Sequence, residues 1–150
     1  MRSSGIEEDG INLLGKRYFV SGYRKQNTEL DRFLFGDVMA EISSGLLGET
    51  VYLHNEQFVV KGQDQRSRFA WHQDSGYSVY RGGAELHAPY LTCWIALDDM
   101  SAQNGTISVL SFDEFGEGRL MEHWWDEDEA AMVGYSGEQP GSLMEVPAGS

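Results

Sequence analysis

A nearly continuous apolar run at residues 91–97 most constrains how this chain can fold. Such a run, bounded by polar segments, is typical of a central β-strand. The dipeptide Asn104-Gly105 follows it and is a strong turn signal, so residues 106–110 are expected to return as the next strand. Eighteen glycines against three prolines also suit a turn-rich β architecture. The sequence therefore predicts a mostly β fold in a single domain over residues 1–150.

Further elements are expected before this core. Residues 1–15 are polar and glycine-rich and suggest a frayed start, whereas residues 16–20 favour a short strand. Residues 50–61 and 69–74 are strand candidates, and residues 112–132 are expected to be irregular to helical.

A flanking helix is predicted to begin at Asn27, whose side chain suits an N-cap, and to end at Gly48, which suits a C-cap. Its apolar residues recur at steps of three and four and predict a stripe that faces the core: Leu30, Phe33, Leu34, Val38, Ile42 and Leu46.

Charge and composition exclude several classes of protein. The formal net charge is −13, which argues against non-specific binding to nucleic-acid phosphates. No run has the length of a membrane helix, and the N-terminus has no apolar signal core. The single cysteine, Cys93, is expected to be a small buried residue rather than a reactive thiol. A reducing, cytoplasmic setting is the default expectation.

His72 and Asp74 are the candidate metal ligands. In an extended segment, residues two apart point to the same face, so this imidazole and this carboxylate should converge, while Gln73 points the opposite way. Two histidines and one carboxylate on one face form the non-heme Fe(II) oxygenase site, and this segment would supply two of the three ligands. The alternative is a surface histidine–aspartate pair at a strand end.

Several motifs follow one another along the middle of the chain. They are Val59-Val60-Lys61-Gly62, then His72-Gln73-Asp74 with Tyr77 shortly after, then Trp94-Ile95-Ala96-Leu97-Asp98-Asp99, and then Asn104-Gly105. In this order and spacing, the chain resembles the phytanoyl-CoA dioxygenase family of Fe(II)- and 2-oxoglutarate-dependent oxygenases. The resemblance runs from about Val51 to Leu110 and returns weakly at residues 134–150.

The resemblance implies a double-stranded β-helix, that is, a cupin-like jelly roll with a flanking helix. It also implies hydroxylation of a small organic substrate with Fe(II), 2-oxoglutarate and O₂, with no catalytic residues beyond the metal ligands. In the family, the second iron-binding histidine and the arginine that binds 2-oxoglutarate follow a segment that matches Pro147-Ala148-Gly149-Ser150. The jelly roll is therefore expected to be C-terminally incomplete, and the chain to be an internal piece of a family member.

Three further residues match family positions that face the cosubstrate or substrate. Gln57 and Lys61 share one face of a predicted strand, and Trp94 lies in the predicted central strand. A salt-bridged lysine and an ordinary core tryptophan are the alternatives for Lys61 and Trp94. The remaining histidines are His54, His87 and His123, of which His123 lies in an acidic segment and not at the family's ligand position.

Two other functions remain open at this point. His72 and Asp74 could belong to a cupin-like binding module that holds no iron. The chain could also be a non-functional remnant, or a subunit that another chain completes. The identity of the substrate and the oligomeric state cannot be read from the sequence.

Overall fold

The computed structural model describes residues 11–14, 17–61, 69–79, 90–115, 118–128 and 131–150. The chain divides into two compact units. The first comprises residues 1–67 and 90–92, and the second comprises residues 68–89 and 93–150.

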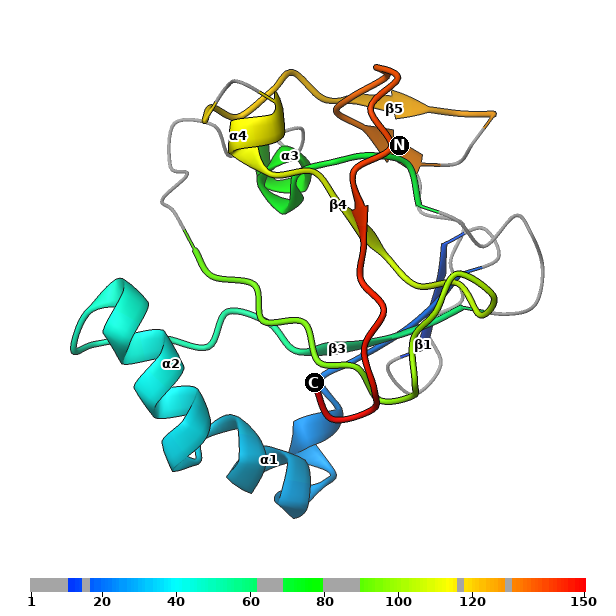
Figure 1. Cartoon of the computed structure of the whole chain (residues 1–150). Helices are drawn as coiled ribbons and strands as arrows, with labels where there is room; N and C mark the ends of the chain where they lie inside the picture. The colour runs from blue at the N-terminus through cyan, green and yellow to red at the C-terminus, as the bar shows by residue number, and fades with distance from the viewer. Residues whose placement is uncertain (1–10, 15–16, 62–68, 80–89, 116–117, 129–130) are drawn as a thin grey trace. The chain divides into compact units, whose positions relative to one another are not determined.

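A three-stranded antiparallel sheet lies in the first unit (Figure 1). Its strands are, in order, β1 (Ile11–Leu14), β2 (Arg17–Ser21) and β3 (Gln57–Val60). Phe19 pairs with Val59 in the register of β2 and β3. The short strand predicted at residues 16–20 is confirmed as β2. The strand predicted over residues 50–61 is confirmed only for its last part, and β1 occupies a stretch that was expected to be frayed.

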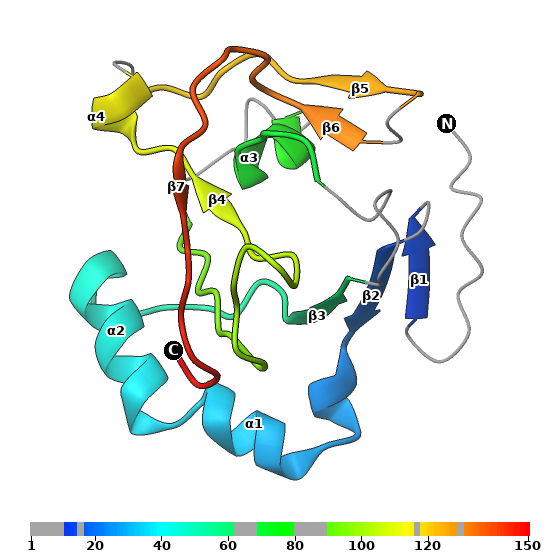
Figure 2. The same ribbon diagram turned by 45° about the vertical axis from the view of Figure 1, so that its right-hand side comes forward.

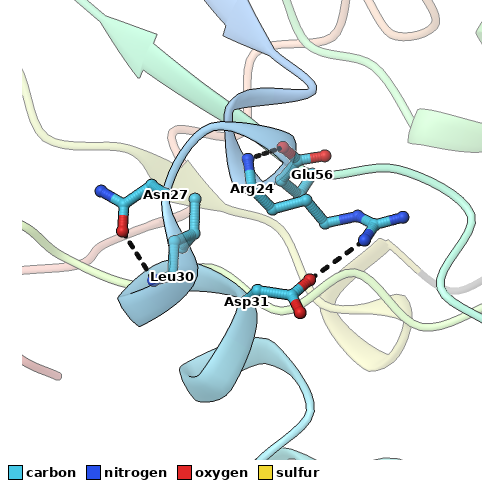
Figure 3. A network of polar contacts seen from close by, with 5 residues as sticks. All are labelled: Arg24, Asn27, Leu30, Asp31 and Glu56. Carbon is cyan, nitrogen blue, oxygen red and sulfur yellow. Dashed lines mark hydrogen bonds and ion pairs between the residues drawn. The ribbon is translucent and has the colours of Figure 1, made fainter.

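The first helical segment begins where the sequence predicts it. A 3₁₀ turn, η1 (Tyr23–Lys25), precedes α1 (Thr28–Leu34). Asn27 is the N-cap of α1, and its Oδ1 accepts hydrogen bonds from the backbone N–H groups of Glu29, at 3.0 Å, and of Leu30, at 3.1 Å. Figure 3 shows the bond to Leu30. These bonds satisfy two donors that have no partner inside the helix.

Arg24 ties this helix to the chain that leads into β3. Its backbone N–H donates to Glu56 Oε1 at 3.0 Å, and its guanidinium pairs with Asp31 Oδ1 of α1 at 3.0 Å (Figure 3). Both contacts are partly buried. Through Arg24, they connect α1 with a residue 32 positions further along the chain.

Replacing Asn27 with alanine should lower the free energy of unfolding by about 1 kcal/mol, because two backbone N–H groups lose their acceptor. Urea denaturation followed by circular dichroism measures this change. Asn27→Asp is the matched control, because a carboxylate oxygen caps a helix as well as an amide oxygen does. An alanine variant as stable as the wild type would show that the cap contributes nothing.

The predicted flanking helix is two helices. The chain breaks at Gly36, which adopts an extended conformation and is the N-cap of α2 (Asp37–Leu47). A Cβ at Gly36 would lie 2.9 Å from the carbonyl oxygen of Arg32, so the close approach of the two turns requires glycine. Gly48 follows α2 with a φ of +103°, which confirms the predicted C-cap position.

The apolar stripe of these helices is not buried. Neither α1 nor α2 contains a buried residue. Four members of the predicted stripe are exposed: Phe33, Val38, Ile42 and Leu46. The prediction that the stripe faces the core is therefore wrong, because periodicity shows that one face is apolar but not that another element covers it.

The second unit contains two small antiparallel sheets and two short helices (Figure 2). Its elements are α3 (Asp74–Ser78), β4 (Ser108–Val109), α4 (Phe112–Phe115), β5 (Trp124–Asp126), β6 (Ala131–Val133) and β7 (Ser142–Leu143). β4 pairs with β7, and β5 pairs with β6. All three residues of β6 are buried, and Met132 is the most deeply buried large side chain among the described residues. Residues 112–132 were expected to be irregular to helical: α4 and the irregular residues 118–123 confirm this for the first part, and the hairpin β5–β6 corrects it for the rest.

Residues 91–97 do not form the predicted central strand. Cys93, Trp94 and Leu97 are exposed, so the expectation of a buried cysteine is also wrong, and only Ala96 is buried. The Ala96 N–H donates to the Ser150 carbonyl at 2.9 Å. A strand buried on both faces needs cover on both faces, whereas most side chains of this run are exposed.

Within the described ranges, the strands form three small sheets and do not close a jelly roll. The predicted mostly β fold with a helix beside it is thus confirmed only at the level of small sheets and helices. No helix in these ranges is long and apolar enough to span a membrane.

Candidate metal-binding site

His72 and Asp74 lie close together, but not on a strand. Residues 69–73 have no regular secondary structure, and Asp74 is the first residue of α3. Gln73 is extended, with φ −101° and ψ 136°, and a single extended residue is enough to turn its two neighbours to the same side. His72 Nε2 and Asp74 Oδ1 are 3.5 Å apart. The expected convergence is observed, whereas the expected strand at residues 69–74 is wrong.

When the His72 ring is neutral, its proton is on Nδ1. This nitrogen is 2.8 Å from the carbonyl oxygen of Ala70, and a carbonyl oxygen can only accept a hydrogen bond. The lone pair therefore belongs to Nε2, the atom that lies near Asp74. Histidines that bind metals usually have this arrangement, in which a backbone carbonyl fixes the tautomer and orients the ring.

The spacing of these two donor atoms fits a divalent metal. Two ligand atoms that each lie about 2.1 Å from one ion, at right angles, are about 3 Å apart. The observed 3.5 Å needs only a small adjustment of either side chain. The His72 side chain is 20% exposed and that of Asp74 is 47% exposed, so the pair is reached from solvent. The Tyr77 ring packs edge-on against His72, with centroids 5.3 Å apart.

Gln73 lies between the two candidate ligands and hydrogen-bonds to residues 119–123. Its backbone N–H donates to His123 Nε2 at 2.9 Å. Its side-chain amide donates to the Arg119 carbonyl at 3.0 Å and accepts from the Met121 N–H at 2.7 Å. We call residues 71–76 the ligand turn. These contacts fix its central residue to a segment almost 50 positions further along the chain.

Both ring nitrogens of His123 have hydrogen-bond partners in the chain. Its Nδ1 donates to the Met121 carbonyl at 2.8 Å, and its Nε2 lone pair accepts the Gln73 N–H. The ring lies between two glycines: a Cβ would be 2.1 Å from the ring at Gly76 and 2.3 Å from it at Gly134. Both glycines are buried, and the Gly134 N–H donates to the Trp71 carbonyl at 2.7 Å.

The candidate cosubstrate residues lie in both units. Gln57, which is exposed, begins β3, and Lys61 follows that strand, both in the first unit. Desolvation by burial lowers the pKa of the Lys61 ammonium below its usual range. Trp94 lies in the second unit, and 51% of it is exposed.

The other histidines differ in their surroundings. His54 is exposed, and its ring lies 6.4 Å from that of Tyr90, centroid to centroid. His87 lies outside the described residues. Among the described residues, no group of three or more histidine, cysteine, aspartate or glutamate side chains is placed to hold a metal.

An open pocket of about 330 Å³ lies beside the β5–β6 hairpin. Its lining residues are Met121, Glu122, Trp124, Gly134, Tyr135, Ser136 and Gly137. It borders the segment that holds His123, but neither His72 nor Asp74 lines it.

The comparison with protein families gives one match. The model described as Phytanoyl-CoA dioxygenase (PhyH) matches residues 7–140. The matched range includes the ligand turn, the β5–β6 hairpin and all three candidate cosubstrate residues. Neither the comparison with curated proteins nor the comparison with solved structures gives a match.

Proposed function

The chain belongs to the phytanoyl-CoA dioxygenase family, and on this premise we propose that it acts as an Fe(II)- and 2-oxoglutarate-dependent oxygenase on a small organic substrate. The observation that carries the proposal is the pairing of His72 Nε2 with Asp74 Oδ1 at 3.5 Å. The Ala70 carbonyl supports it, because it fixes the histidine tautomer that leaves Nε2 as the metal-binding nitrogen.

His72 and Asp74 would hold the iron as two of its three protein ligands. When bound, Fe(II) with 2-oxoglutarate would supply the activation of O₂ that allows a substrate C–H bond to be hydroxylated. The protein's part is to orient the two donors: the carbonyl of Ala70 keeps the imidazole ring in place, and the start of α3 directs the carboxylate. The third ligand is not His123, whose lone pair already accepts a backbone N–H.

Lys61, Gln57 and Trp94 are proposed to bind the cosubstrate. A half-buried ammonium attracts a carboxylate more strongly than an exposed one does, because less water screens the two charges. The Gln57 amide and the Trp94 indole N–H can each donate a hydrogen bond to a carboxylate oxygen.

A metal-free binding module is the second candidate. It is favoured by the absence, within the described ranges, of a third acidic, histidine or cysteine side chain beside the ligand pair. In such a module, the hydrogen-bonded His72 and the nearby Asp74 would be a polar pair without an ion. The two functions differ in whether the chain binds a divalent metal through Asp74.

Titration with Mn(II), a redox-inactive substitute for Fe(II), tests this difference. We expect the wild-type chain to bind Mn(II), and Asp74→Ala to weaken that binding at least about 10-fold. Removing a side chain that only hydrogen-bonds to a metal ligand already lowers metal affinity by this much, and Asp74 would be a ligand itself. Electron paramagnetic resonance of free Mn(II) gives the dissociation constant.

Asp113→Ala is the matched control, because Asp113 is an exposed carboxylate on α4. Adding 2-oxoglutarate should tighten Mn(II) binding in an oxygenase. Equal affinities in the wild type and in Asp74→Ala would show that Asp74 is not a metal ligand, and the same result without any Mn(II) binding would favour the binding module.

A further inference from the structure

We propose that His123 is the positioning residue of the metal site: its neutral ring fixes Gln73 and thereby sets the direction of both His72 and Asp74. The inference rests on the proposed metal role of those two residues. It assigns a specific role to a histidine that has neither the family's ligand position nor a lone pair available for a metal.

The geometry of the ligand turn depends on one backbone unit. Gln73 lies between the two candidate ligands, and its extended conformation turns them to the same side. A rotation of this residue toward helical dihedrals would separate the two side chains, because neighbours in a helix point in different directions. The hydrogen bond from the Gln73 N–H to His123 Nε2, at 2.9 Å, opposes this rotation.

His123 can fix Gln73 because it is itself fixed. Its Nδ1–H donates to the Met121 carbonyl, which leaves Nε2 as an acceptor and sets the plane of the ring. The two flanking glycines, Gly76 and Gly134, leave room for a flat ring and for nothing thicker, since any Cβ there would overlap it. A ring with two glycines against it and a hydrogen bond at its far nitrogen has little freedom to follow a moving turn.

A second set of contacts joins the same two segments. The side-chain amide of Gln73 bonds to the Arg119 carbonyl and the Met121 N–H, as a paired strand would. The Gly134 N–H bonds to the Trp71 carbonyl just before His72. The ligand turn is thus attached at Trp71, just before the ligand pair, and at Gln73, between its two members, where His123 binds the backbone.

The test compares two substitutions of His123 by Mn(II) titration. His123→Leu removes the hydrogen-bond acceptor but keeps a side chain of similar size. We expect the dissociation constant for Mn(II) to rise about 10- to 100-fold, as it does when a hydrogen-bond partner of a metal ligand is removed. In His123→Gln the amide oxygen takes the place of Nε2, so most of the affinity should return. His54→Leu is the matched control, because His54 is an exposed histidine in the first unit.

A merely structural role would give a different pattern. Rescue by glutamine depends on the hydrogen-bond acceptor and not on the ring, and circular dichroism at the titration temperature shows whether each variant is folded. If His123→Leu does not fold, His123→Asn takes its place: its shorter amide can keep a donor near the Met121 carbonyl but has no acceptor where Nε2 lies, so Mn(II) binding should also weaken.

The outcomes separate this inference from the proposed function. Mn(II) binding that depends on Asp74 but is unchanged in folded His123→Leu, or in folded His123→Asn, overturns the positioning role and leaves the oxygenase proposal intact. Binding that is lost in His123→Leu and is not restored in folded His123→Gln also overturns it. A wild-type chain that binds no Mn(II) through Asp74 overturns both.

Discussion

Replacing Asp74 with alanine should lower Fe(II)-dependent succinate formation from 2-oxoglutarate by at least about 100-fold, since loss of a ligand's partner alone costs 10- to 100-fold. The carboxylate is one of only two metal-binding side chains that converge in the ligand turn, and His72 Nε2 alone cannot hold a divalent ion firmly. Succinate is measured after anaerobic loading of the protein with Fe(II) and then exposure to O₂. The assay uses a form of the protein that also carries the family's distal histidine and arginine, and in that form the wild type should release succinate slowly even without the true substrate.

The exposed Asp113 provides the control for this assay. Asp113→Ala should leave succinate formation unchanged, because that carboxylate lies on α4 and has no place in the ligand turn. Turnover that survives Asp74→Ala would show that another carboxylate binds the iron. If the wild type binds Mn(II) but forms no succinate in this assay, the metal site stands and the oxygenase reaction is contradicted.

Replacing Gly76 with alanine should reduce the free energy of unfolding by about 3 kcal/mol, the upper part of the range for overpacking a filled interior. The added Cβ would lie 2.1 Å from Cδ2 of His123. Neither side can move away easily, because His123 is bonded through both ring nitrogens and Gly76 is buried at the centre of α3. Denaturation with urea measures the change.

Two comparisons separate the overlap with the His123 ring from the general effect of replacing a helical glycine with alanine. Gly45→Ala in α2 should increase stability by about 0.5–1 kcal/mol, because its Cβ meets nothing within 4 Å and alanine is the better helix former. In a His123→Ala background, Gly76→Ala should cost much less than in the wild type, since the ring that it strikes is gone. Additive effects of the two substitutions would contradict a direct contact.

The features that the sequence predicted correctly are those set by a few neighbouring residues. Asn27 caps α1 because its own side chain reaches the next two or three N–H groups. Gly48 and Gly105 have positive φ angles because a turn of the local chain requires them. Such features depend little on the rest of the fold, and residue type alone indicates them.

The features that the sequence did not predict depend on distant contacts. Whether Val38 or Cys93 is buried is decided by what lies opposite, and a periodic or apolar pattern does not contain that information. The β5–β6 hairpin was missed because its acidic surroundings suggested a solvated segment. A signal was present: Trp124 and Trp125 favour strands, and the Asp126 side chain accepts from the Asp128 N–H at 3.0 Å, as in a turn.

The candidate site shows both situations. A spacing of two brings His72 and Asp74 together because one extended residue between them is enough, so the convergence was predicted even though the strand was not. The role of His123 had no such local signal. Its partners Gln73, Gly76 and Gly134 are distant from it in sequence, and only the folded chain brings them into contact with its ring.

The bond between Gln73 and His123 also bears on the order of events during folding. These residues are 50 positions apart, so a long loop must close before the bond can form, whereas the β5–β6 hairpin closes locally. The chelating geometry is therefore a late product of the folding reaction. An ion that recognises only the finished turn has no partner in the transition state. Its effect would be to slow unfolding and leave the folding rate nearly unchanged.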